Sequence, residues 1–323
     1  MRDEKGVYVG LKTISYPSES EVLRDLSGFL AIARGLRPRW RKLKLPTQSE
    51  TVRPYGEAKT LWFRGQSDAS WGLSPKIWRN EYNDANEVEI RLEFESVGHP
   101  LTQAGTARDK WHWYFLMQHY GVPTRILDWT TNPLVALYFA VRDAVETDNA
   151  VWVIDPWRWN HAHVKGMYGP AIAGWRETTG YLLDLEDACD TDEDEQTRQK
   201  WPIAIEPPHI DRRIAAQGSK FVIFGTKKNM TDSPAINRPR GGNGKHAILD
   251  KIVVPKNTAE NLREELDQIG INEGTMFPDL DGLGKHIAWE WKTRVAPSRP
   301  KKSRGRARAI RNPKMVSPDL KER

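Results

Sequence analysis

The segment Leu61-Trp62-Phe63-Arg64-Gly65-Gln66 places a cation and a glycine at the end of an apolar, aromatic run that is typical of a buried β-strand. A guanidinium is costly to bury there unless an anion or a polar ligand satisfies it. The segment therefore predicts a strand whose arginine, Arg64, serves a binding site. An arginine that caps helix carbonyls or pairs with Asp128 would fit the same pattern.

A second segment, residues 118–140, reads Q-H-Y-G-V-P-T-R-I-L-D-W-T-T-N-P-L-V-A-L-Y-F-A and sets polar groups between two apolar stretches that we expect to be helical. Asn132 and Pro133 are typical of a helix N-cap and first helical position. The helix that they open should run to about Val145 and be buried, because it is apolar nearly all round. Polar side chains packed so densely against core sequence indicate a binding cleft. These side chains are His119, Arg125, Asp128, Thr130 and Thr131.

The composition is that of a globular protein, since 38% hydrophobic residues and 14 Trp in 323 residues suffice for a core. A single cysteine, Cys189, excludes an internal disulfide. The first residues are charged, and no apolar run approaches the ~20 residues that a membrane helix needs. We expect a cytoplasmic protein without a membrane segment. We expect no metal site, because His161 and His163 lack a second ligand pair at metal spacing.

The net charge of +6 resides in the C-terminal segment. Residues 298–323 hold ten Lys and Arg against two acids, so the segment is +8 and the rest of the chain is −2. This composition predicts a disordered tail. Such a tail either attracts RNA or DNA without sequence specificity or only keeps the protein soluble. The tail cations that we expect to contact nucleic acid are Arg299, Lys301, Lys302, Arg304, Arg306, Arg308 and Arg311.

Further segments predict a mixed sheet with flanking helices. We expect helices at about residues 18–35, 86–97, 108–120, 258–269 and from 279 through 286, and strands at about 7–9, 150–154, 220–224 and 248–254. Residues 180–200 are acidic and are interpreted as a solvated surface insertion, and residues 241–245 as a flexible basic loop. Because strands and helices mix without regular βαβ spacing, the sequence predicts one mixed α/β (α+β) domain over residues 1–297.

Four blocks of sequence, residues 61–66, 118–140, 213–221 and 275–280, resemble the FRG domain, which is named for its Phe-Arg-Gly motif. The resemblance covers about residues 20–290. The same order of motifs is similar, more weakly, to the Arg–Ser–Glu class of ADP-ribosyltransferases. This second resemblance implies a split sheet that binds NAD.

Carried over by position, Arg64 would hold the phosphates and ribose of NAD, because its fork donates parallel hydrogen bonds and keeps its charge. Thr130 or Thr131 would orient the nicotinamide ribose, and Gln217 would stand near the place of the catalytic glutamate. The other residues that the resemblance assigns to NAD binding are Gly65, Gln66, His119, Tyr120 and Arg125.

The glutamine is a departure from the transferase pattern. The transition state is oxocarbenium-like, and a glutamine contributes no negative charge to it. Either another acid substitutes, with Asp128 or Glu206 as the nearest candidates by sequence, or catalysis is slow or absent. An alternative interpretation is that Arg125 and Asp128 pair across a turn, in which case a buried pair would be structural. Gln217 would be structural if the transferase analogy fails.

The resemblance implies an NAD-dependent transferase or glycohydrolase of the toxin or phage-defence type, with a nucleic-acid or protein target and an antitoxin or regulatory partner. The alternative is a non-catalytic FRG module that binds nucleic acid or a partner protein. A compact pocket in which Arg64, Thr130 and Gln217 converge would favour the enzyme. An open, basic, aromatic-lined groove would favour the binding module.

Overall fold

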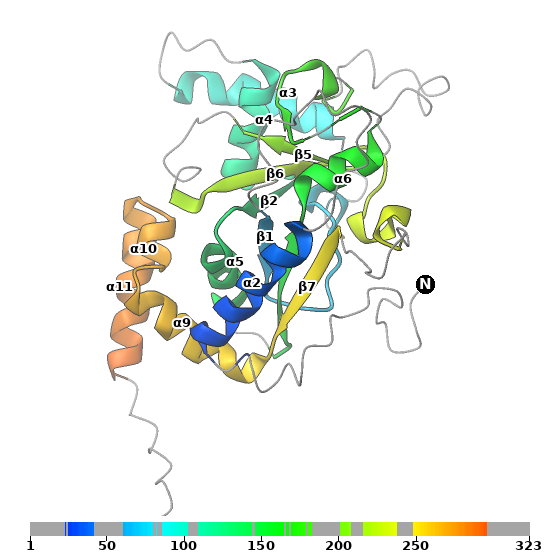
Figure 1. Ribbon diagram of the computed structural model, residues 1–323. Coiled ribbons are helices and arrows are strands. Elements are labelled where there is room, and N and C mark those ends of the chain that lie inside the picture. Colours follow the sequence, from blue (N-terminus) through cyan, green and yellow to red (C-terminus); the bar gives the residue numbers. More distant parts are fainter. Residues whose placement is uncertain are drawn as a thin grey trace, which may run out of the picture.

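The computed structural model describes residues 25–41, 61–79, 86–102, 109–143, 146–164, 169–178, 201–207, 216–237 and 248–295, with a few single positions between them. These residues form a seven-stranded sheet of order β4-β5-β6-β2-β1-β3-β7 with helices around it (Figure 1). Neighbouring strands pair antiparallel except β4 and β5, which are parallel. The predicted mixed α/β fold is confirmed at this level.

The strands are β1 (Trp62–Gln66), β2 (Ile126–Thr130), β3 (Asn149–Ile154), β4 (Ala171–Ile172), β5 (Ile203–Glu206), β6 (Ser219–Ile223) and β7 (Leu249–Val254). The α-helices are α2 (Leu26–Arg41), α3 (Glu87–Gly98), α4 (Lys110–His119), α5 (Pro133–Val141), α6 (Pro156–His163), α9 (Ala259–Gln268), α10 (Glu273–Met276) and α11 (Leu280–Val295). A short 3-10 helix, η1 (Lys76–Trp78), follows β1.

Several predicted elements have different ends in the structure. The buried helix α5 begins as expected, with the Asn132 side chain accepting from the Leu134 amide, but it ends at Val141 and not at Val145. The last helix continues past residue 286 to Val295. Residues 126–130 form a central strand, although the sequence analysis placed them between two helices. No element was predicted from the sequence at α6 or β5.

Several predictions concern residues outside the described ranges. They are the strand at 7–9, the helix start at 18, the acidic run from residue 183 to 200 with Cys189, the loop at 241–245 and the tail at 298–323. Among the residues that the structure describes, no helix has the length and apolar character needed to cross a membrane.

The sheet opens between its two central strands. β1 meets β2 at one residue pair, Phe63 with Thr130. In contrast, β1 pairs with β3 along all five of its residues. On the other side, β2 pairs with β6 from Ile126 to Thr130. We call the opening beyond the single pair the β1–β2 seam.

The apolar core follows this division. On one face of the sheet, a cluster around α2, α5 and α9 packs on β1, β3 and β7, and a separate cluster around α4 packs on β2, β5 and β6. The opposite face carries one cluster that continues across the seam and is rich in tryptophan, with Trp62, Trp129, Trp152 and Trp159. The first face therefore has a gap in its core at the seam, between α4 and α5.

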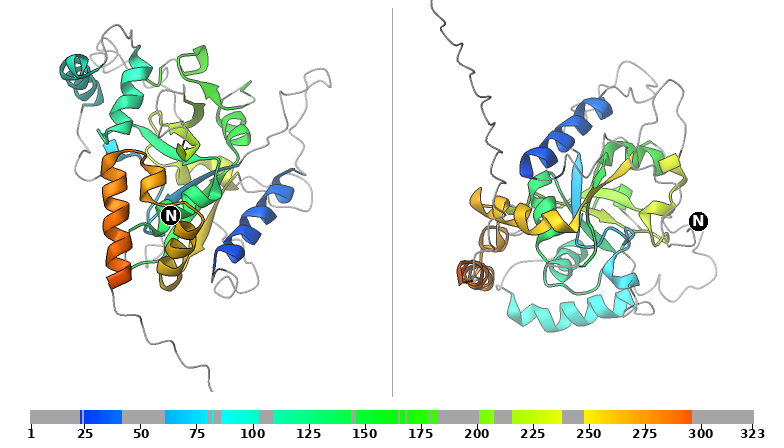
Figure 2. Two further views of the ribbon diagram at one scale, coloured as in Figure 1. Left: turned by 90° about the vertical axis from the view of Figure 1, so that its left-hand side faces the viewer. Right: turned by 90° about the horizontal axis from the view of Figure 1, so that it is seen from below.

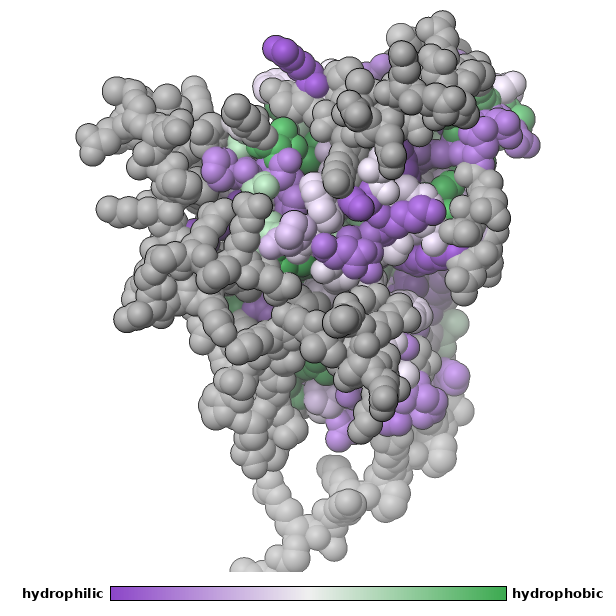
Figure 3. Space-filling view, turned by 90° about the vertical axis from the view of Figure 1, so that its right-hand side faces the viewer, coloured by the Kyte–Doolittle hydropathy of each residue, from purple (hydrophilic) through white to green (hydrophobic). Residues whose placement is uncertain are grey.

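The remaining elements lie at the periphery. Figure 2 shows α10 and α11 side by side on one side of the molecule, away from α2. On the face shown in Figure 3, the described residues are mostly hydrophilic, and their apolar side chains reach the surface only in small patches.

Candidate functional site

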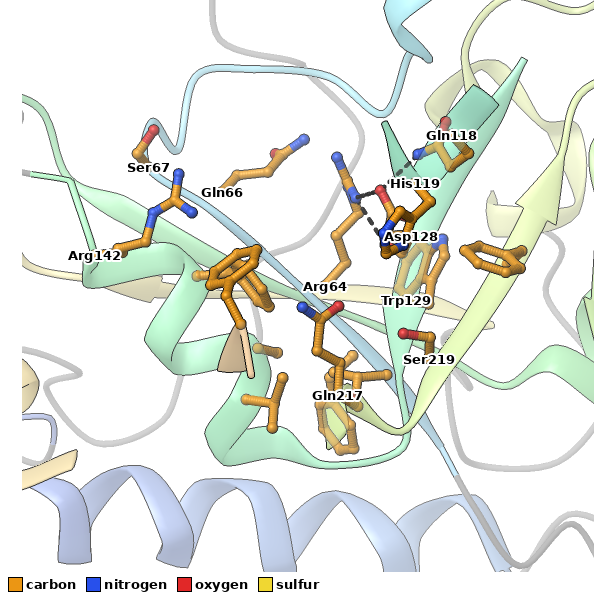
Figure 4. Close-up of a pocket in the computed structure, with 18 of the residues that line it drawn as sticks. Arg64, Gln66, Ser67, Gln118, His119, Asp128, Trp129, Arg142, Gln217 and Ser219 are labelled. Atoms are coloured by element: carbon orange, nitrogen blue, oxygen red, sulfur yellow. Dashed lines mark hydrogen bonds and ion pairs between the residues drawn. The ribbon is translucent and has the colours of Figure 1, made fainter. Parts of the chain in front are cut away.

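A cavity of about 350 Å³ lies at the β1–β2 seam, within the range of roughly 300–1,000 Å³ that is usual for ligand pockets. Its walls come from β1, β2, α4, α5 and the residues around the start of β6 (Figure 4). The charged lining residues are Arg64, Arg79, Arg142 and Asp128. Rings from Trp71, Phe115, His119, Phe139, Phe221 and Phe277 also line the cavity. Because cations outnumber carboxylates among these residues, the cavity favours an anionic ligand.

Arg64 lies at the middle of β1, and not at its end as the sequence analysis placed it. It shares the strand face of Trp62 and Gln66, and its guanidinium reaches across the seam. Nη1 donates to the Asp128 carbonyl at 2.7 Å and lies 3.9 Å from Asp128 Oδ2. β1 and β2 pair only at Phe63 and Thr130, so at Asp128 the strands are no longer paired. The Asp128 carbonyl therefore accepts from the Arg64 guanidinium and not from a main-chain amide of β1.

The Arg64 side chain is 14% exposed, and its buried Nε has no hydrogen-bond partner in the part of the chain that the structure describes. Burial lowers the pKa of Arg64 to about 10; nearby Asp128 opposes this shift and Arg79 adds to it. The guanidinium is therefore charged at neutral pH. The guanidinium is buried and charged, and its Nε is left without a partner among the described residues. It can therefore donate a charge-assisted hydrogen bond to an anion.

Asp128 presents its carboxylate to the cavity, with 56% of its side-chain surface exposed. Gln118 Nε2 donates to Oδ2 at 2.8 Å, and Gln118 Oε1 accepts from the buried hydroxyl of Thr124. This chain of hydrogen bonds orients the carboxylate, and Figure 4 shows its bond from Gln118 to Asp128. Packing around the carboxyl raises the pKa of Asp128 despite this exposure, whereas Arg64 and Gln118 lower it. The ion pair of Asp128 is with Arg64, so the suggested pairing with Arg125 is wrong.

Gln217 enters the cavity from the helical residues 216–217 immediately before β6. Gly218, with φ of 56°, completes the turn, and the Thr131 amide donates to its carbonyl at 3.2 Å. The Thr130 hydroxyl donates to the Gln217 carbonyl at 2.6 Å and accepts from the Asn132 amide at 3.0 Å. Gln217 Nε2 donates to the Met276 carbonyl at 3.0 Å. The Thr130 hydroxyl proton is thus used to hold the Gln217 turn.

Gly65 permits the contact between β1 and α5. A Cβ atom at this position would lie 2.0 Å from the Ala136 carbonyl oxygen and 2.5 Å from the Ala140 amide nitrogen. Only glycine allows a helix backbone to approach a strand this closely. Because Ala136 also lines the cavity, Gly65 fixes the position of one wall.

The structure brings most of the predicted site residues to one cavity. Arg64, Gly65, Gln66, His119, Asp128, Thr130 and Gln217 line it. Arg125 lies elsewhere, buried, with its guanidinium donating to Glu87 and to the carbonyls of Phe224 and Tyr181. Glu87 and Tyr114 outweigh the effect of burial and raise the pKa of Arg125. Tyr120, Thr131 and Glu206 are not among the lining residues.

Sequence reasoning missed several lining residues. Arg79 and Trp71 lie in the irregular segment after β1 and carry no signal in the sequence. Arg142 follows the apolar run of α5 and is a cation at the end of a buried helix, which is a signal that was available. Phe277 belongs to one of the four sequence blocks but was assigned no role. Among the described residues, no group of three or more His, Cys, Asp and Glu is arranged to hold a metal ion.

Comparison with protein families shows a match between residues 59–149 and the FRG domain. The matched range contains β1, α4, β2 and α5, and therefore Arg64, Asp128 and Thr130. Gln217 lies outside it. No curated protein and no solved structure matches the chain.

Proposed function

From the FRG domain that residues 59–149 carry, we propose that the cavity at the β1–β2 seam binds NAD and that the protein is an ADP-ribosyltransferase-like enzyme. The observation that carries the proposal is the meeting of Arg64, Asp128 and Gln217, from three separate segments, in one cavity that is also lined by Arg79, Arg142 and several aromatic rings. The opening of the sheet at the seam supports the likeness to a split transferase sheet.

The binding roles follow from the charges and rings of the cavity. The pyrophosphate of NAD is an anion, and the Arg64 fork, with its unpartnered Nε, donates to it. Arg79 and Arg142 add positive charge to the same cavity. The phenylalanine rings from α4, α5 and β6 offer flat apolar faces to nicotinamide and adenine.

The chemical step breaks the bond between the nicotinamide nitrogen and ribose C1′. Nicotinamide leaves with the electron pair of that bond and becomes neutral, while the ribose gains positive charge. The Asp128 carboxylate stabilises this charge and takes the proton of the acceptor as the acceptor bonds to C1′. Asp128 thereby supplies the negative charge that Gln217 lacks.

Gln217 keeps a positioning role. Because the Met276 carbonyl holds its Nε2, the amide has a fixed orientation, and its Oε1 accepts a hydrogen bond from the ribose 2′-hydroxyl. Thr130 acts through the Gln217 turn. The wider setting that we propose is a toxin or phage-defence effector in the cytoplasm, controlled by an antitoxin or regulatory protein, with a tail that attracts RNA or DNA.

The test uses the purified full-length chain and NAD labelled in its nicotinamide ring, with separate RNA, DNA and protein pools as acceptors. Nicotinamide release and NAD affinity are measured for wild type, Arg64→Ala and Arg64→Lys. Arg176→Ala is the matched control, because Arg176 is exposed and does not line the cavity. Circular dichroism checks that each variant is folded.

We expect wild type and Arg176→Ala to bind NAD and release nicotinamide, and Arg64→Ala to do neither. Arg64→Lys keeps the charge and loses the fork, so its NAD affinity should fall by about 10- to 100-fold. A wild-type protein that binds no NAD, or a folded Arg64→Ala variant that binds it equally well, would overturn the proposal. NAD binding without nicotinamide release would indicate a non-catalytic FRG module.

A further inference from the structure

One side of the cavity mouth is built from aromatic rings and cations. Trp71 and Arg79 line the cavity, and both have exposed surface. Trp71 is 50% exposed, and Tyr120, which follows the lining residue His119, is 70% exposed. We call this surface the basic–aromatic rim. It comprises Trp71, Arg79 and Tyr120 and extends away from the cavity along η1 to Lys76 and Trp78 and to Lys228 beside the Trp78 ring; these last three residues do not line the cavity.

Contacts within the structure fix the rim in place. Lys76 Nζ donates to the Gly121 carbonyl at 2.7 Å, which joins η1 to the end of α4. Lys228 Nζ lies 5.8 Å from the ring centroid of Trp78. The backbone beside Lys228 is attached to the segment after β1, because the Met230 amide donates to the Leu73 carbonyl at 3.2 Å. The rings and cations are therefore presented by ordered backbone.

The charge of the rim is positive. Lys76, Arg79 and Lys228 contribute three cations. In the flanking segments 67–79 and 225–233 the acids are Asp68 and Asp232, and Asp68 accepts from the Ser70 amide at 2.7 Å. The exposed rings of Trp71 and Tyr120 and the half-buried ring of Trp78, with cations beside them, suit a ligand that has flat faces and a regularly spaced negative charge.

Single-stranded nucleic acid has both properties. Its unpaired bases stack on exposed rings, and its phosphates pair with the cations between them. A duplex hides its base faces within its own stack. An acidic peptide supplies charge but has no flat face at each repeat. The observations therefore favour a single strand over the other polyanions.

We propose that the acceptor substrate of the cavity is a single-stranded nucleic acid that lies along the basic–aromatic rim. A base stacks on Trp71 or Tyr120 at the mouth, and phosphates contact Lys76, Arg79 and Lys228. The identification of this strand as acceptor rests on the proposed function. A nucleophilic atom of the base at the mouth forms the new bond to ribose C1′ as the bond to nicotinamide breaks, and its proton passes to Asp128.

The test measures binding of a fluorescent single-stranded 20-mer and of its duplex by anisotropy over a range of salt concentrations. The full-length chain is used with its natural tail and with the tail cations of residues 299–311 replaced by glutamine, so that attraction by the tail is separated from the rim. The rim variants are Trp71→Ala and the double variant Lys76→Ala with Lys228→Ala. The controls are Trp175→Ala and Lys285→Ala, which change exposed side chains outside the rim.

We expect Trp71→Ala to weaken single-strand binding by roughly 5- to 140-fold, which corresponds to the ~1–3 kcal/mol that one base stack contributes. The double lysine variant should reduce the slope of log affinity against log salt by about 1.4, because each phosphate contact to a single strand contributes roughly 0.7. Both control variants should bind as wild type does. The duplex should bind more weakly than the single strand.

The inference is overturned if rim variants bind the single strand as the controls do, or if the duplex or an acidic peptide binds more tightly than the single strand. NAD affinity of the double lysine variant separates this inference from the proposed function, because neither lysine lines the cavity. If wild type turns over NAD normally but the rim variants bind the oligonucleotide as wild type does, the rim is rejected as a binding surface and the proposed NAD function stands. If the chain binds the oligonucleotide at the rim but binds no NAD, the rim stands as a binding surface. The proposed NAD chemistry and the role of the strand as acceptor are then both rejected.

Discussion

Substitution of Gly65 by alanine should destabilise the protein severely. The added Cβ would lie 2.0 Å from the Ala136 oxygen, 2.5 Å from the Ala140 nitrogen and 2.9 Å from the Phe139 carbonyl carbon, whereas ordinary contacts begin at about 3.4 Å. All three atoms belong to the backbone of α5, so relief requires a shift of more than ~1 Å by a buried helix. Overpacking usually costs about 1–3 kcal/mol, and a clash with backbone belongs at the upper end.

We therefore expect the free energy of unfolding to fall by about 3 kcal/mol and Tm to fall by about 6 °C or more. Urea unfolding followed by tryptophan fluorescence measures the first, and a thermal melt by circular dichroism measures the second. Gly35→Ala is the matched control. A Cβ there meets no atom within 4 Å in α2, so the change should stabilise by up to ~1 kcal/mol. A free energy of unfolding for Gly65→Ala within ~1 kcal/mol of the wild-type value would refute the predicted clash.

Two further predictions concern the polar groups beside the cavity. Glu87→Gln should lower the free energy of unfolding by about 3–5 kcal/mol in urea, because it leaves the buried Arg125 guanidinium without its counter-charge; an unchanged urea midpoint would contradict this. Gln118→Leu removes a donor that lowers the pKa of Asp128, so that pKa should rise. Because the proposed step uses ionised Asp128, the acidic limb of the pH–activity profile should move to higher pH. Carboxyl NMR titration measures the Asp128 pKa independently of activity, and an unchanged or lower pKa would contradict the role of the hydrogen-bond chain.

Local sequence signals were sufficient for the elements that carry the site. Asn132 and Pro133 marked the start of α5, because capping chemistry depends on adjacent residues alone. Arg64 stood out because a cation in an apolar strand needs a compensating partner. Gln217 is distant in sequence from Arg64, and it was assigned to the same site only through the resemblance to known motifs.

The missed features depend on tertiary structure. β2 (Ile126–Thr130) is buried on both faces except at Asp128, so its sequence shows no alternation of apolar and polar residues. The position of Arg79 in the cavity depends on how η1 packs against the end of α4, which no local pattern encodes. The seam itself is a matter of strand register, and Phe63 and Thr130 do not reveal that they form the single pair.

The seam gives the sheet an interior edge. Beyond Phe63 and Thr130, the two central strands no longer satisfy each other's main-chain donors and acceptors, and Arg64 occupies one of the acceptors so released. Edges of this kind elsewhere in proteins capture amides and extended segments through main-chain hydrogen bonds. In the proposed binding site, part of the surface offered to a ligand therefore belongs to the polypeptide backbone, which alanine scanning leaves intact. Side-chain substitutions will accordingly understate what the proposed site contributes to ligand binding.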